Sequence, residues 1–155
     1  MATSLSQIVL CPDYQQQQLL LQHSELLKAA RYELQRADIA HRNTFGRPYS
    51  LKDLFMLLKQ IVLYNPIYNS LYSKSIHYVA RELGGHKVSF LPATSDIVSY
   101  PIQIPVPYIT LTHGCFVTKK YGSIPMTGLL NSNIKIADAF IYRSAGMWVL
   151  SLLTD

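Results

Sequence analysis

The spacing of apolar residues divides the chain into a helical part and a β part. Up to Gly85 the apolar residues recur every three or four positions, as on one face of a helix. After Gly85, short alternations, β-branched residues and prolines replace that period. The pattern predicts one α+β domain over residues 1–155, with helices over about 13–85 and a small, mainly antiparallel β-sheet over about 87–153.

The first predicted helix begins at Asp13, which forms a capping box with Gln16, and runs for about 30 residues without glycine or proline. Leu20, Leu27 and Leu34 lie near heptad spacing on one side of it. Such a helix is longer than most helices of single domains, which makes these leucines candidate oligomerisation residues. The alternative is that it is simply the longest helix of a bundle.

A second capping box, Ser50 with Asp53, begins the helix whose amphipathic pattern is the clearest in the chain. Proline cannot continue helical hydrogen bonding, so this helix is expected to end at Asn65-Pro66. Its predicted core residues are Leu51, Leu54, Phe55, Leu58, Ile61 and Val62.

A third helix is predicted to follow at once, from Asn65 as N-cap to the pair Gly84-Gly85. The three helices would form one unit with short connections. At about 100° per residue, the expected core face of the third helix carries Tyr68, Tyr72, Ile76, Val79 and Leu83.

The opposite face of the third helix is basic and aromatic: Lys74, His77, Tyr78 and Arg81. Lys74 and Arg81 could bind phosphates while Tyr78 or His77 stacks on a base, which makes this face the main candidate for nucleic-acid binding. The alternative is that this face of the third helix is an ordinary solvated surface without a ligand. Candidate extensions of the surface are Arg47, in the turn Thr44–Ser50, and the basic-aromatic turn Lys119, Lys120 and Tyr121.

In the β part, the segment 97–106 contains Pro101 and Pro105, which indicates an edge strand or an extended arm. An arm is suited to lie on a neighbouring subunit, so Tyr100, Ile102 and Ile104 are further candidate oligomerisation residues. The other predicted elements are a strand over 87–91, two short strands over 108–120 broken at His113-Gly114, a loop over 121–132, and a closing hairpin of 133–142 and 147–153.

The chain is poor in charged residues for a soluble domain. Charged residues make 15% of the chain, against roughly 25% in typical soluble domains, while hydrophobic residues make 49%. We therefore expect part of the surface to be covered by copies of the same chain, a partner or a membrane surface. The net charge of +5 without any run of basic residues indicates a folded basic patch.

Two cysteines cannot form a disulfide framework, and no stretch has the roughly 18 apolar residues of a membrane span. The N-terminus lacks the basic region of a signal peptide, so an intracellular location, in cytoplasm or nucleus, is predicted.

Signals for catalysis are sparse. Cys115 lies two residues after His113, which raises a cysteine hydrolase as the enzyme hypothesis to consider, but no orienting group or oxyanion hole can be identified. No metal-ligand spacing and no phosphate-binding loop is present, so no metal, cofactor or catalytic residue is predicted.

The segment Ser144–Leu152, SAGMWVLSL, resembles the end of the vesiculovirus matrix protein, where a Gly-x-Trp-Val-Leu strand also nearly closes the chain. The resemblance covers a small part of the chain, and the PPxY motif and lysine-rich leader of that family are missing, so no functional residue is carried over. It is consistent with a small, basic, self-associating viral structural protein.

The first functional hypothesis is a non-enzymatic, self-associating viral structural or accessory protein that binds nucleic acid, with RNA favoured over DNA, through the basic-aromatic surface. The alternative is a matrix-like or adaptor module whose basic face binds an anionic membrane or an acidic protein partner. The net charge of +5 is equally compatible with both hypotheses, so it does not distinguish them.

Overall fold

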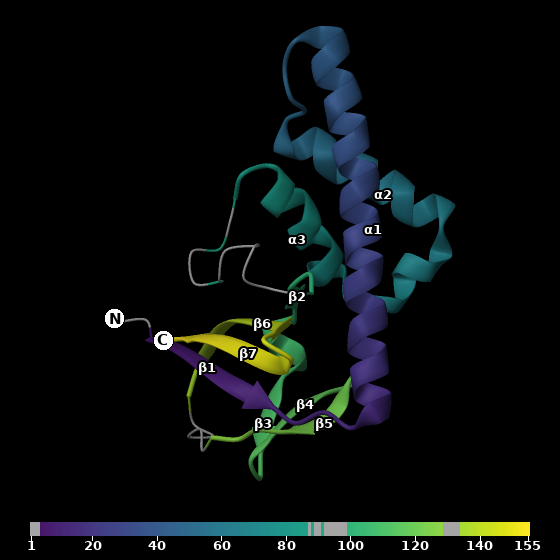
Figure 1. Ribbon diagram of the computed structural model, residues 1–155. Helices are drawn as coiled ribbons and strands as arrows, with labels where there is room; N and C mark the ends of the chain where they lie inside the picture. The colour runs from purple at the N-terminus through teal and green to yellow at the C-terminus, as the bar shows by residue number, and fades with distance from the viewer. Residues whose placement is uncertain (1–3, 87, 89–90, 92–98, 129–133) are drawn as a thin grey trace. The chain divides into compact units, whose positions relative to one another are not determined.

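The computed structural model describes residues 4–86, 88, 91, 99–128 and 134–155 (Figure 1). Three α-helices in the N-terminal half are followed by two small antiparallel sheets, one of which includes an N-terminal strand, so the predicted α+β class is confirmed. The chain forms two compact units, Met1–Ser24 with Ser89–Asp155, and Glu25–Val88. The predicted single domain stays a prediction.

Helix α1 (Tyr14–Phe45) begins at the predicted capping box. Gln16 donates its backbone N–H to Asp13 Oδ1 at 2.8 Å, and Asp13 donates its own N–H to Gln16 Oε1 at 2.9 Å. Two of the backbone donors at the helix start are thereby satisfied. The first residues of α1 belong to the β-containing unit, and the rest belongs to the helical unit.

Helix α2 (Leu51–Tyr64) also begins as predicted, because the N–H of Asp53 donates to Ser50 Oγ at 3.2 Å. The expected third helix is interrupted. A 3₁₀ helix (Pro66–Ser70) comes first, Leu71 and Tyr72 are extended, and α3 (Ser73–Leu83) follows. The break lets the large side chains of Tyr68, Leu71 and Tyr72 all be buried.

The β-containing unit holds two sheets, with strand orders β1-β7-β6-β2 and β3-β4-β5 (Figure 1). Ala145 and Gly146 both have positive φ, as a tight hairpin requires, and join β6 to β7. The bounds are β1 Ser4–Leu10, β2 Ile102–Gln103, β3 Thr110–Thr112, β4 Cys115–Thr118, β5 Gly122–Pro125, β6 Ile136–Ser144 and β7 Met147–Thr154, with a 3₁₀ helix at Val106–Tyr108.

The closing hairpin and the two strands around His113-Gly114 are confirmed. Two strands were not predicted. β1 pairs with β7 along its whole length, from Ser4 opposite Thr154 to Leu10 opposite Trp148, and β5 forms inside the expected loop. The strand expected over 87–91 falls largely outside the described residues, as does the start of the segment 97–106.

The candidate oligomerisation residues are buried, contrary to what a free contact surface between copies requires. The affected side chains are Leu20, Leu27, Leu34, Tyr100, Ile102 and Ile104. Ile102 lies in β2, which pairs with β6 and stands last in the strand order β1-β7-β6-β2, so the edge strand is the alternative that the described residues support. These side chains therefore belong to the core, and self-association stays a prediction that needs another surface.

Candidate functional site

Helix α2 carries more apolar surface than its own unit covers. Only Leu54 and Leu58 are fully buried in it, although the sequence predicts six core residues. Met56 and Leu63 are 57% and 72% exposed, outside the expected core face. The remaining predicted core residues, Leu51, Phe55, Ile61 and Val62, are half-buried. An apolar helix surface of this extent marks an interaction site more often than it marks a solvated face.

Helix α3 lies along α2 and runs in the opposite direction. A Cβ placed on Gly84, at the end of α3, would be 3.2 Å from Leu51 Cδ1 at the start of α2. One turn further along α2, the ring of Phe55 meets the ring of His77 edge-on, with centroids 5.6 Å apart. The close approach at Gly84 and the ring contact of Phe55 with His77 place α3 directly against α2, and a groove lies between the two helices.

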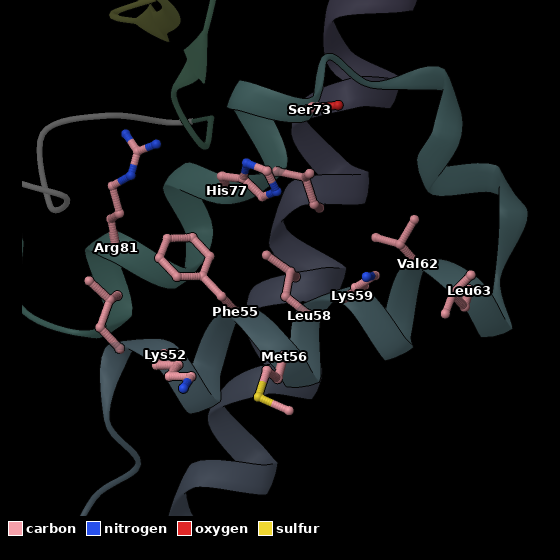
Figure 2. A pocket seen from close by; sticks show the side chains of 12 residues that line it. Lys52, Phe55, Met56, Leu58, Lys59, Val62, Leu63, Ser73, His77 and Arg81 are labelled. Carbon is pink, nitrogen blue, oxygen red and sulfur yellow. The ribbon is translucent and has the colours of Figure 1, made fainter.

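The groove, here called the α2–α3 groove, is an open hollow of about 920 Å³ within the helical unit (Figure 2). Its apolar lining residues are Leu51, Phe55, Met56, Leu58, Val62, Leu63 and Ile76. Its polar lining residues are Lys52, Lys59, Ser73, His77 and Arg81. Figure 2 shows Lys52 and Arg81 toward one end of the groove and Val62 and Leu63 toward the other.

The charge of the groove has one sign. Lys52, Lys59 and Arg81 are cationic, and none of the described residues that line the groove is acidic. Partial burial, and secondarily the Arg81 guanidinium, lower the pKa of His77, so its imidazole is neutral at pH 7. The site is therefore an apolar floor with three permanent cations, which is suited to an apolar ligand that carries negative charge.

No protein-family model matches the chain, and no curated protein matches it in sequence. The geometry of this groove is therefore the main indication of function.

The structure brings together only part of the predicted basic-aromatic face. His77 and Arg81 line the groove, and Lys74 lies half-exposed on the same side of α3. Tyr78 is 4% exposed, so the expectation that it is free to stack on a base is wrong. The interruption before Ser73 leaves α3 buried around most of its circumference, including Ser75 and Glu82.

The two candidate extensions lie elsewhere in the chain. Arg47 is exposed in the turn after α1, where its carbonyl is 2.9 Å from His41 Nδ1. Lys119 and Lys120 belong to the other compact unit, and the predicted exposure of Tyr121 is wrong because its side chain is 2% exposed. Lys52 and Lys59 were not identified as site residues from the sequence. The one feature that could have indicated them is their position beside the apolar face of α2.

Tyr121 is held by a buried polar network instead of facing solvent. Its hydroxyl is 2.6 Å from His23 Nδ1, and its carbonyl accepts a hydrogen bond from Gln16 Nε2 at 2.9 Å. Burial, and secondarily the Lys120 ammonium, lower the pKa of His23 to about 4. This network positions the start of α1 against the turn between β4 and β5.

The free energy of unfolding is expected to fall on acidification because of His23. The unfolded chain binds a proton at this imidazole below about pH 6.5, whereas the folded protein does not do so until about pH 4. Stability is therefore full above about pH 6.5 and decreases by at most about 1.4 kcal/mol per pH unit between these values. Urea denaturation at about pH 7 and pH 5, on the natural protein and on His23→Gln, measures it. An equal loss of stability in both proteins would contradict this assignment.

The described residues give the thiol hypothesis no support. Cys115 is half-buried in β4, opposite Thr112 and Pro125, and no hydrogen bond joins it to His113 among the residues that the structure describes. Within that same part of the chain, no three His, Cys, Asp or Glu side chains are grouped as a metal site would require. None of the described helices combines the length and apolar character that a membrane crossing needs.

Proposed function

We propose that this protein is a non-enzymatic interaction module that binds an acidic segment of a partner protein in the α2–α3 groove. The observation that carries the proposal is the groove itself: seven apolar side chains accompanied by Lys52, Lys59 and Arg81, with no acidic residue in the described part of the lining. Apolar side chains supply the burial that drives association, and complementary charge selects the partner and speeds encounter.

A nucleic acid fits this groove less well than a protein does. Single-stranded nucleic acids bind surfaces that pair cations with several exposed aromatic rings. Tyr78 and Tyr121 are buried, and Phe55 is already in edge-on contact with His77. Half of the twelve lining residues are aliphatic or methionine side chains, which cannot contact phosphates favourably.

A second copy of the chain is also a poor occupant, because it offers little complementary charge. Among the described residues, Glu25 is paired with Lys28, Asp38 with Arg42, and Glu82 with Arg31. The other described acidic residues are scattered along the chain: Asp13 and Asp53 in the capping boxes, Asp138 as acceptor from Gln103 Nε2, and the exposed Glu33 and Asp155. The net charge of +5 and the scattered acidic residues therefore favour a different protein as the source of an acidic, apolar segment.

Fluorescence anisotropy tests the proposal with the full chain and a panel of labelled peptides of about 18 residues, all with the same leucine and glutamate content in different orders. At about 0.15 M salt we expect at least one acidic peptide to bind, and its lysine-for-glutamate counterpart not to bind. The proposal would be overturned if a single-stranded RNA binds and no acidic peptide does, or if none of the probes binds.

An exchange of charge provides the matched control. Lys59→Glu changes an exposed groove lysine, and Lys135→Glu makes the same change at an exposed lysine outside the groove. The first is expected to weaken acidic-peptide binding by about tenfold, and the second to leave it within about twofold. Equal effects would show that overall charge, not the groove, governs binding.

A further inference from the structure

We infer that the occupant of the α2–α3 groove is an amphipathic helix with two acidic residues separated by two helical turns and two apolar residues between them. This rests on the proposed function and specifies its ligand. The inference comes from the order of side chains that α2 presents to the groove and from the kind of backbone that lines it.

The backbone of the groove favours a helix over an extended peptide. Both walls are α-helices, whose N–H and C=O groups are paired internally. The described lining residues all lie in α2 and α3 and none in a strand, so an extended peptide could not complete its own hydrogen bonds there by joining a sheet edge. A helix satisfies its own backbone and needs only side-chain contacts, as in other helix-in-groove complexes.

The side chains of α2 repeat with the period of one helix face. Lys52, Phe55, Met56 and Lys59 follow one another at positions i, i+3, i+4 and i+7, and all four line the groove. Residues with this spacing lie on one side of a helix, and the two lysines are about 10.5 Å apart along its axis. Figure 2 shows Phe55 and Met56 between the two lysines in this view.

A complementary helix that packs along α2 must present the same spacing with inverted charge. Helices that pack lengthwise cross at small angles, so matched positions along two turns stay in register. Two acidic residues at i and i+7 can then meet Lys52 and Lys59, while apolar residues at i+3 and i+4 contact Phe55 and Met56. Because the spacing is symmetric, the pattern is the same for either direction of the bound helix.

Three peptides from the acidic panel isolate the spacing. All have the same leucine content and two glutamates. The first peptide has its glutamates at i and i+7, on either side of leucines at i+3 and i+4. The second has its glutamates at i and i+5, about 140° apart around the helix. The third has the order of the first, with its central alanine replaced by proline to prevent helix formation. Affinity is measured by anisotropy, and far-UV circular dichroism reports helix formation on binding.

We expect the i, i+7 peptide to bind at least tenfold more tightly than either other peptide and to gain helicity in the complex. A lysine-for-glutamate version of it should gain affinity for the double variant Lys52→Glu with Lys59→Glu, which tests direct charge pairing. Equal affinities of all three peptides would overturn the helix inference and leave the proposed function standing. If no peptide binds, both the helix inference and the proposed function are overturned. If anionic phosphatidylserine vesicles bind more tightly than the peptides, the groove binds a lipid surface instead.

Discussion

Val62→Asp is expected to weaken binding of the i, i+7 acidic peptide by about 100-fold or more, because the change places a negative charge on the apolar floor. Val62 lines the groove, and the new carboxylate would be desolvated by the bound helix and would repel its glutamates. Val62 is half-buried in the free protein, so the free energy of unfolding should fall by less than about 1 kcal/mol. Anisotropy titration and urea denaturation measure the two effects separately.

Ile39→Asp is the matched control for this variant. Ile39 is a β-branched helix residue that is 49% exposed on α1 and does not line the groove. Its replacement should leave peptide affinity within about twofold. If Ile39→Asp weakens binding as much as Val62→Asp does, the α2–α3 groove is not the binding surface.

Leu34→Ala is expected to destabilise the protein by about 3 kcal/mol, because a fully buried leucine leaves a cavity when truncated. Leu34 is 0% exposed in α1, where heptad spacing had indicated a contact between copies. A core role and an oligomer role predict different behaviour. For a core residue, the midpoint of urea unfolding falls and is independent of protein concentration.

Light scattering coupled to size exclusion completes the Leu34→Ala test. The oligomeric state of the variant should equal that of the natural protein under conditions in which both are folded. A shift from oligomer to folded monomer, with a stability that depends on protein concentration, would contradict the core assignment and restore the leucine seam as an oligomer contact.

The features predicted well from the sequence are those with local causes. Side chains three residues apart decide both capping boxes, Asp13 with Gln16 and Ser50 with Asp53, and both have the expected hydrogen bonds. The turn at Ala145-Gly146 needs residues that tolerate positive φ, and glycine supplies one of them. Short-range chemistry of this kind determines helix starts and hairpins without reference to the rest of the fold.

The features that were missed depend on distant partners. β1 has only a weak alternating pattern and is a strand because it pairs with β7 at the other end of the chain. β5 contains Gly122 and Pro125, which favour a loop, yet it pairs with β4. The interruption at Leu71 and Tyr72 contains neither glycine nor proline, so no local residue predicts it. It accompanies the burial of large side chains.

The candidate site shows the same limit. The helical period of α2 was correct, but Phe55 and Val62 were assigned to the core because the pattern gives the apolar face and not what covers it. His77 and Arg81 were recognised as one basic face, whereas Tyr78, on the same predicted side, is buried. Which part of an apolar face stays open depends on the position of neighbouring helices, which periodicity does not contain.

The most direct test of the central claim is a ¹H–¹⁵N correlation spectrum of the full chain, recorded during titration with the i, i+7 acidic peptide. We expect the chemical-shift changes to concentrate on the backbone amides of α2 and α3 around Lys52, Phe55, Lys59 and His77. Changes centred on the Lys119-Lys120 turn or on the sheets, or no change at saturating peptide, would contradict the assignment of the α2–α3 groove as the binding surface.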